Sequence, residues 1–331
     1  MITIEEALSW LNYPGSTTLS EMSQTFIKSM SNPHLSTGSL DGLINSALAA
    51  CEVNPNPFEY QELLLACGVV NYNHHRFQKA WEEIQRARKL YIQGSHYVAI
   101  SSWMLGCVEW ALQRNGAAYL NWDGSRRLFE DYIIVYERDH DTEKRDWYRA
   151  RWQLMNVDLA CTFEEAYTWL NQFDAIELDS SIIQMRNKMV DDYKQKKYDE
   201  MTRQMEVIQK IAFAASDYLV YPQILVDCAL LAYQMENKKD VAADLLKQAL
   251  VIFIPRSHQQ AVVCWMLGIV EWLDKSSVEQ AVINWQKSRE IFLDLALSED
   301  HANRQDRRRW YKRTGQVMRL ALEQKIKQTQ G

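Results

Sequence analysis

The sequence predicts an all-α protein built from antiparallel helix pairs, and three observations support this prediction. Apolar residues recur at i, i+3, i+4 and i+7 along nearly all of the 331 residues, which is the period of an amphipathic helix. The chain has only 11 Gly and 6 Pro, too few for the many turns of a β-rich fold. The third observation is an internal duplication, and a long internal period is typical of stacked structural units.

The duplication extends over the whole chain. Three segments of the first half return in the second half at offsets of 159, 162 and 163 residues. The matched segments are 3–12 with 162–171 (TIEEALSWLN and TFEEAYTWLN), 103–110 with 265–272 (WMLGCVEW and WMLGIVEW), and 147–148 with 310–311 (WY in both). A nearly constant offset predicts two equivalent helical modules, residues 1–160 and 161–331. Residues 147–160 run almost directly into the helix around Glu164, so we expect one continuous superhelix without a linker.

The individual helices follow from apolar stripes and from the breaks between them. Residues 77–91 place Ala80, Ile84, Ala87 and Tyr91 on one stripe, and small alanines on such a stripe allow a neighbouring helix to approach closely. The equivalent stripe of the second module consists of Ala242, Leu246, Ala249 and Phe253. Breaks of helix-stopping or capping type divide the chain into elements of 12 to 18 residues. These breaks are Asn54-Pro55-Asn56-Pro57 before a helix from Phe58, Gln93-Gly94-Ser95, Asp179-Ser180, Lys196-Lys197-Tyr198, Tyr221-Pro222 before the next helix, and Pro255-Arg256-Ser257.

Composition and charge exclude several classes of protein. A hydrophobic fraction of 47% is enough for a large core and excludes a disordered chain. The net charge of -6 is unevenly spread, because residues 301–331 carry nine Lys and Arg against two acidic residues. The six cysteines are dispersed without a Cys-x-x-Cys pair, which favours free thiols in a reducing compartment. Neither a signal peptide nor an apolar span long enough for a bilayer is evident, so we expect a cytoplasmic protein with no membrane contact.

The helix pairs resemble tetratricopeptide repeats. In the second module, Trp265, Trp272, Ala281, Trp285 and Ser288 match the family's spacing of large and small residues, whereas Leu267-Gly268 falls one residue early. In the first module Ala118, Trp122 and Ser125 keep the same spacing. The resemblance implies a right-handed superhelix, an α-solenoid of antiparallel helix pairs. It also implies that Trp103, Trp110, Trp265 and Trp272 are buried between paired helices, although an aromatic clamp for a ligand peptide is the alternative.

The same resemblance implies which residues face the concave surface of the superhelix. They form a mostly apolar stripe with methionines, suited to an amphipathic helix or an extended apolar peptide. This inner stripe consists of Met104, Val108 and Leu112 in the first module and Met266, Val270, Leu273 and Asp274 in the second. The alternative is that tight curvature packs the stripe against the chain's own helices.

A second candidate surface is the basic C-terminal helix. It carries Arg304, Arg307, Arg308, Arg309, Lys312 and Arg313. These side chains could contact an acidic protein or the phosphates of a nucleic acid, or they could form a solvated face that the helix dipole favours.

Catalytic and metal-binding patterns are not recognisable in the sequence. It has no glycine-rich phosphate loop, no Gly-x-Ser-x-Gly and no His-Glu-x-x-His. The recurring Ser95-His96 and Ser257-His258 pairs are expected to cap helices or form turns. We therefore expect a non-catalytic scaffold or regulatory adaptor without cofactor or metal, which binds a partner protein or peptide. The alternative is a helical-repeat protein that docks nucleic acid through its last helix.

Overall fold

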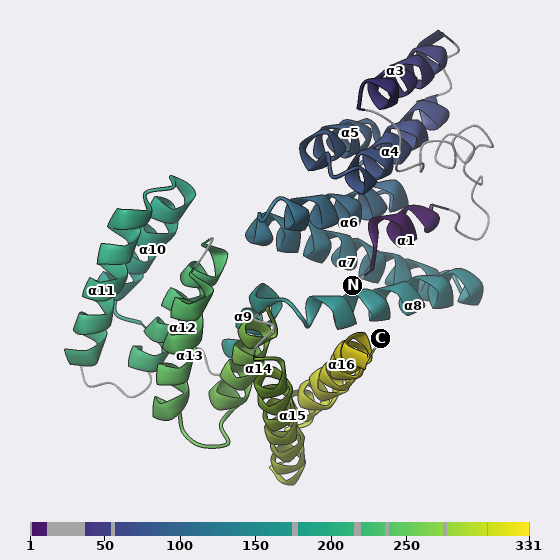
Figure 1. Cartoon of the computed structure of the whole chain (residues 1–331). Coiled ribbons are helices and arrows are strands. Elements are labelled where there is room, and N and C mark those ends of the chain that lie inside the picture. Colours follow the sequence, from purple (N-terminus) through teal and green to yellow (C-terminus); the bar gives the residue numbers. More distant parts are fainter. Residues whose placement is uncertain are drawn as a thin grey trace. The chain divides into compact units, whose positions relative to one another are not determined.

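The computed structural model describes residues 2–11, 37–53, 57–173, 178–214, 220–235, 238–273, 277–302 and 304–330. These residues form 15 helices (Figure 1). No strand occurs in these ranges. The prediction of an all-α fold is confirmed.

The chain divides into two compact units, Met1–Leu159 and Ala160–Gly331. The helices of unit 1 are α1 (Ile4–Ser9), α3 (Thr37–Val53), α4 (Pro57–Asn73), α5 (Phe77–Leu90), α6 (His96–Ala111), α7 (Asn115–Arg138) and α8 (Thr142–Leu159). The helices of unit 2 are α9 (Phe163–Leu170), α10 (Ser180–Lys194), α11 (Tyr198–Ala214), α12 (Val220–Gln234), α13 (Lys239–Ile252), α14 (His258–Leu273), α15 (Val278–His301) and α16 (Gln305–Gln330).

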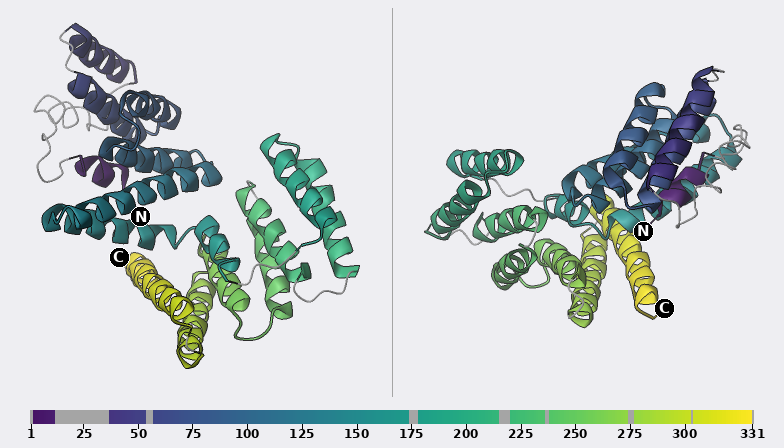
Figure 2. Two further views of the ribbon diagram at one scale, coloured as in Figure 1. Left: turned by 180° about the vertical axis from the view of Figure 1, so that it is seen from behind. Right: turned by 45° about the horizontal axis from the view of Figure 1, so that its top comes forward.

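Within each unit, consecutive helices pack side by side. In unit 1 each helix from α3 to α8 contacts the next one, and in unit 2 the same holds from α10 to α16 (Figure 2). The short first helices are the exception. Helix α1 packs against α6 and α4, and α9 packs against α14 and α12. Each unit is therefore a row of helices with one short helix laid across it.

The large aromatic residues form the same scaffold in both units. The indole N–H of Trp122 donates to the Trp103 carbonyl oxygen at 3.2 Å, and that of Trp285 donates to the Trp265 carbonyl oxygen at 3.1 Å. These four tryptophans are at most 1% exposed. Their predicted burial is confirmed for Trp103 and Trp265. Trp110 and Trp272, which follow Trp103 and Trp265 on the same helices, are only partly buried. The ring centroids of Trp110 and Trp122 are 5.7 Å apart, and those of Trp272 and Trp285 are 5.3 Å apart.

Two glycines make this scaffold possible. A Cβ atom added to Gly106 would lie 2.4 Å from the Trp122 ring, and one added to Gly268 would lie 2.5 Å from the Trp285 ring. Because an indole is rigid, only glycine lets the paired helices come this close. The Leu267-Gly268 pair, which falls one residue early in the tetratricopeptide spacing, thus has its glycine at the helix crossing.

The alanine stripes also lie in the core. Ala80, Ile84 and Ala87 are fully buried, as are Ala242, Leu246 and Ala249. Their burial confirms the stripe predicted for each module.

Five of the turns between helices in the described ranges use a residue with left-handed backbone conformation that is not glycine. His75, Gln113, His140, Lys196 and Arg256 have φ values of 58 to 60°. A residue in this conformation ends a helix by redirecting the chain. Residues other than glycine and asparagine rarely adopt this conformation. The scarcity of glycine in the sequence is therefore compatible with many short turns.

Two predicted breaks have different outcomes. Asp179 caps α10 as expected, and its carboxylate accepts a hydrogen bond from the Ser181 N–H at 2.8 Å. The prediction that Tyr221-Pro222 precedes a helix is wrong, because α12 begins at Val220. Proline is tolerated in the first turn of a helix, where its missing N–H would have no partner within the helix.

None of the described helices is both long enough and apolar enough to cross a lipid bilayer.

Candidate functional site

The inner stripe proposed from the sequence lies largely inside the units. Met104, Val108 and Met266 are fully buried, and Val270 is 4% exposed. Of the remaining stripe residues, Leu112 is partly buried, Leu273 is 39% exposed and Asp274 lies outside the described residues. A partner could contact Met104, Val108 and Met266 only after a helix of the same unit had moved away.

The short helices α1 and α9 pack against α6 and α14, the helices that carry the inner stripe. Each begins with a threonine cap, because Thr3 accepts a hydrogen bond from the Glu6 N–H and Thr162 accepts one from the Glu165 N–H. Each has a tryptophan at its C-terminal end, Trp10 as the cap of α1 and Trp169 in the last turn of α9, that packs on the aromatic scaffold. The ring centroids of Trp10 and Trp103 are 6.4 Å apart, and those of Trp169 and Trp265 are 6.3 Å apart. The sequence match of these segments therefore corresponds to a matched packing role.

A buried histidine joins the short helix to the end of each unit. His96 Nε2 lies 3.0 Å from the Trp10 carbonyl oxygen, and the Tyr148 hydroxyl lies 2.9 Å from His96 Nδ1. The carbonyl can only accept, so Nε2 carries the proton and the tyrosine donates to Nδ1. The equivalent contacts of unit 2 are His258 Nε2 to the Trp169 carbonyl oxygen at 2.7 Å and the Tyr311 hydroxyl to His258 Nδ1 at 3.3 Å.

Sequence reasoning assigned these histidines only a capping or turn role. The neighbouring serines do cap helices, since Ser95 accepts from the Val98 N–H. The histidine bridges were not predicted, although the Trp-Tyr pair at 147–148 and 310–311 recurs at a similar offset to the Ser-His pair.

Burial lowers the pKa of His96 to about 4, because the effect of burial outweighs the opposing effect of the hydrogen bond to the Trp10 carbonyl. The ring is therefore neutral near pH 7, as the bridge requires.

Both units expose apolar side chains at the same three positions. Exposed single apolar residues are ordinary on a protein surface, but here the positions match across the duplication. They are Ile92 (83% exposed) with Ile254 (55%), Leu120 (70%) with Ile283 (53%), and Ile134 (61%) with Leu297 (60%). We call these six residues the matched apolar set.

The matched apolar set lies on equivalent elements of the two units. In unit 1 it occupies the α5–α6 turn and helix α7, and the Tyr132 hydroxyl of α7 donates to the Gly94 carbonyl of that turn at 3.0 Å. In unit 2 it occupies the α13–α14 turn and α15, which an ion pair between Arg256 and Asp294 joins. The turn and the long helix are thus held together in both units.

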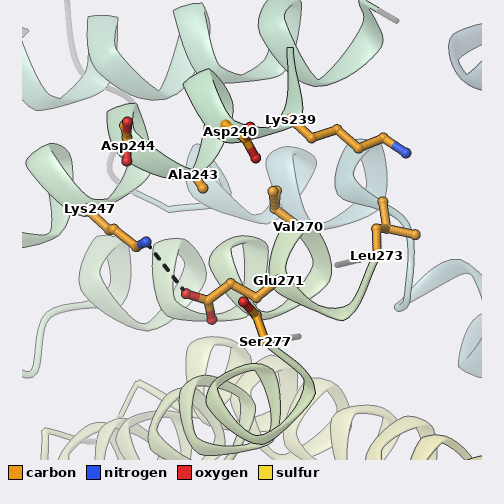
Figure 3. A pocket seen from close by; sticks show the side chains of 9 residues that line it. All are labelled: Lys239, Asp240, Ala243, Asp244, Lys247, Val270, Glu271, Leu273 and Ser277. Carbon is orange, nitrogen blue, oxygen red and sulfur yellow. Dashed lines mark ion pairs between the residues drawn. The ribbon is translucent and has the colours of Figure 1, made fainter. Parts of the chain in front are cut away.

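A pocket of about 510 Å³ opens on the surface of unit 2 between α13 and α14 (Figure 3). Helix α13 contributes Lys239, Asp240, Ala243, Asp244 and Lys247, helix α14 contributes Val270, Glu271 and Leu273, and Ser277 precedes α15. The Glu271 carboxylate and the Lys247 ammonium point toward one another, with Oε1 and Nζ 3.9 Å apart. Burial raises the pKa of Glu271, against the hydrogen bond from Asn284. Two residues of the predicted stripe, Val270 and Leu273, thus line this pocket.

The basic residues at 304–313 are partly engaged within unit 2. Arg304 pairs with Glu299, Arg308 with Asp300 at 2.9 Å, and Arg309 with Asp306 at 3.1 Å. The Arg307 guanidinium lies 5.0 Å above the Phe173 ring. Lys312 and Arg313 are exposed on α16. The local positive charge is therefore smaller than the residue count suggests.

Unit 2 also contains a buried polar cluster that the sequence did not suggest. Asp227 is 3% exposed, and its carboxylate accepts from the Tyr167 hydroxyl at 2.6 Å and from the Gln223 amide at 3.1 Å. Arg186 Nε lies 3.1 Å from the same carboxylate. By the duplication, Ala66 takes the position of Asp227 in unit 1.

No group of three or more His, Cys, Asp or Glu that could hold a metal ion is found in the described ranges. Cys67, Cys107, Cys161, Cys228 and Cys264 are not joined by disulfides, and burial raises the pKa of Cys107 and Cys228 to about 12.

Comparison with known proteins gives no family assignment: no protein-family model matches the chain, and a search of curated proteins finds no match either.

Proposed function

We propose that this protein is a non-catalytic scaffold or regulatory adaptor that binds a partner protein or peptide through the surface of its helical repeats. The proposal includes the tetratricopeptide character and right-handed superhelix that the sequence resemblance implies. It also places the protein in the cytoplasm, which suits cysteines that are not joined by disulfides.

The main observation in favour of this proposal is the matched apolar set. Exposed apolar side chains reduce solubility and have no role in the core, so their presence at three equivalent positions in both units favours use at an interface. Because the inner stripe is largely buried, the contact is proposed instead at the exposed apolar residues of α7 and α15 and of the α5–α6 and α13–α14 turns.

The alternative proposal, nucleic-acid docking through α16, receives less support. Three of the six basic residues already pair with carboxylates of the same unit. The alternative requires that binding weaken steeply with salt and that Lys312→Ala with Arg313→Ala reduce it. A chain that binds neither RNA nor DNA at low salt would end this alternative.

The protein-binding proposal can be tested by quantitative affinity capture from the native host. The double variant Ile283→Ser, Leu297→Ser is compared with the wild-type chain and with Gln286→Ser, an exposed polar position on the same helix. We expect at least a tenfold loss of one or more captured proteins with the double variant and no loss with the control. Equal capture by all three proteins would contradict the proposal for unit 2, and the pair Leu120→Ser, Ile134→Ser repeats the test in unit 1.

A further inference from the structure

The two units differ at the position that the unit 2 pocket occupies. In unit 1, Trp81 of α5 packs against the core, and its indole N–H donates to Glu109 Oε1 at 3.1 Å. The alignment of Ala80 with Ala242 and of Ile84 with Leu246 places Ala243 where unit 1 has Trp81. Replacing an indole by a methyl group leaves space between the helices, and the pocket lies at this place.

The acceptor of the missing indole is retained in unit 2. Asn121 donates to Glu109 Oε2 at 2.6 Å, and Asn284 donates in the same way to Glu271 Oε2 at 2.7 Å. Glu271 therefore has the orientation of Glu109, and its side chain is only 7% exposed. Its second oxygen, Oε1, has Lys247 Nζ at 3.9 Å among the described residues (Figure 3), which is too far for a hydrogen bond.

The pocket thus combines an aromatic-sized space with a carboxylate oxygen, Glu271 Oε1, that has no donor within hydrogen-bond distance in the part of the chain that the structure describes. Its volume of about 510 Å³ lies in the range of small-molecule and side-chain sites. Val270 supplies an apolar wall, and the rim carries charges of both signs, with Lys239 and Lys247 beside Asp240 and Asp244. Such a rim can pair with the polar main chain of an extended peptide.

We propose that the α13–α14 pocket binds a tryptophan side chain of a partner polypeptide, with the indole N–H donating to Glu271 Oε1 as Trp81 does to Glu109 in unit 1. The chain itself supplies the evidence for the occupant, because its other half shows which ring fits between these two helices. The inference rests on the proposed function in one respect, namely that the indole comes from a bound protein.

A fluorinated probe tests the pocket without any knowledge of the partner. Binding of N-acetyl-5-fluorotryptophanamide to the full chain is measured by fluorine NMR, beside the same compound methylated at the indole nitrogen. We expect saturable binding of the first probe and at least tenfold weaker binding of the methylated one, since about 1.4 kcal/mol for a hydrogen bond to a charged group corresponds to a factor of ten. No binding of the first probe, or equal binding of both, would overturn the proposal.

Three variants assign the binding to this pocket. Ala243→Trp introduces the unit 1 residue and should abolish probe binding, whereas Glu271→Gln should weaken it at least fivefold and leave the helix pair intact. Trp81→Ala should open a second site in unit 1 and raise the stoichiometry from one to two probes per chain. Circular dichroism verifies that each variant is folded. Probe binding that is unchanged in Ala243→Trp and Glu271→Gln would overturn the assignment.

The source of the indole is tested separately from the proposed function. Tighter binding of free indole or free tryptophan than of the capped probe would contradict a polypeptide source. Ala243→Trp is also used in the affinity capture, where loss of a captured protein supports the proposal and undiminished capture contradicts it. Failure of the proposed function alone would appear as undiminished capture by the Ile283→Ser, Leu297→Ser variant while the probe still binds.

Discussion

Units 1 and 2 share the contacts of their aromatic core, but the space between α5 and α6 of unit 1 is filled differently from the space between α13 and α14 of unit 2. The indole-to-carbonyl bond, the glycine at the crossing and the Trp–His–Tyr bridge occur in both units. Trp81 fills one unit where Ala243 leaves a pocket in the other. The duplicated contacts thus maintain the fold, and the change from Trp81 to Ala243 is where a distinct binding property is expected.

The largest expected effect is on the shared aromatic scaffold. Trp285→Ala removes a fully buried indole and its hydrogen bond to the Trp265 carbonyl oxygen. We expect it to lower the free energy of unfolding by about 3–5 kcal/mol, measured by urea denaturation followed by circular dichroism. Trp122→Ala is the matched change in unit 1 and should cost a similar amount. A cost below about 1 kcal/mol in either unit would show that the units do not share this scaffold.

The second effect concerns the histidine bridge and its pH dependence. The folded-state pKa of His96, about 4, is below the ordinary value of 6.5, so the unfolded chain takes up the proton first as the pH falls. Neutral His96 therefore contributes about 3 kcal/mol to the free energy of unfolding above about pH 6.5. This contribution is lost as the pH falls toward 4.

Urea denaturation of the wild-type chain at pH 7 and pH 4.5 measures this loss. His96→Gln can keep both hydrogen bonds without titrating, so it should show a smaller loss over the same interval. Identical pH dependence in the two proteins would contradict the bridge. His258→Gln then shows whether the equivalent bridge of unit 2 behaves in the same way.

The third effect belongs to unit 2 alone. Arg186→Leu leaves the buried Asp227 carboxylate without its cation. Because the Arg186 side chain is 34% exposed, we expect a loss of about 2–3 kcal/mol, below that for a fully buried pair. Thermal unfolding provides the measurement. The double variant Arg186→Leu, Asp227→Ala, which restores the unit 1 residue at one position, should recover part of the loss, and no recovery would argue against the ion pair.

The smallest effect is expected at the glycine of the helix crossing. Gly268→Ala places a methyl group 2.5 Å from the Trp285 ring, and overpacking of this kind costs about 1–3 kcal/mol. Gly315→Ala is the control, because its Cβ would meet only the end of the Leu293 side chain at 3.9 Å. Thermal unfolding should separate the two variants, and equal melting temperatures would contradict a tight crossing.

Periodicity was enough to predict the helices and the burial of Ala80 and Ala87, and the tetratricopeptide resemblance predicted the burial of Trp103 and Trp265. They were not enough to assign the inner stripe, because helix period does not say which segment covers a given face. Helices α1 and α9 come from positions nearly 90 residues away from the histidines that hold them. The pocket could not be predicted either, because only the structure shows that Ala243 and Glu271 line the same space. The change from Trp81 to Ala243 can be read from the aligned halves of the sequence.

Thiol labelling tests the central claim, that the inner stripe is core and the matched apolar set is surface. Met266→Cys and Ile283→Cys are each placed in a chain with Cys51→Ser and Cys161→Ser and are reacted with a water-soluble maleimide under native conditions. Met266 is fully buried and Ile283 is 53% exposed, so we expect the thiol at 283 to react at the rate of a free thiol and the thiol at 266 at least a hundredfold more slowly. Equal labelling rates would contradict the account and return the inner stripe to the surface.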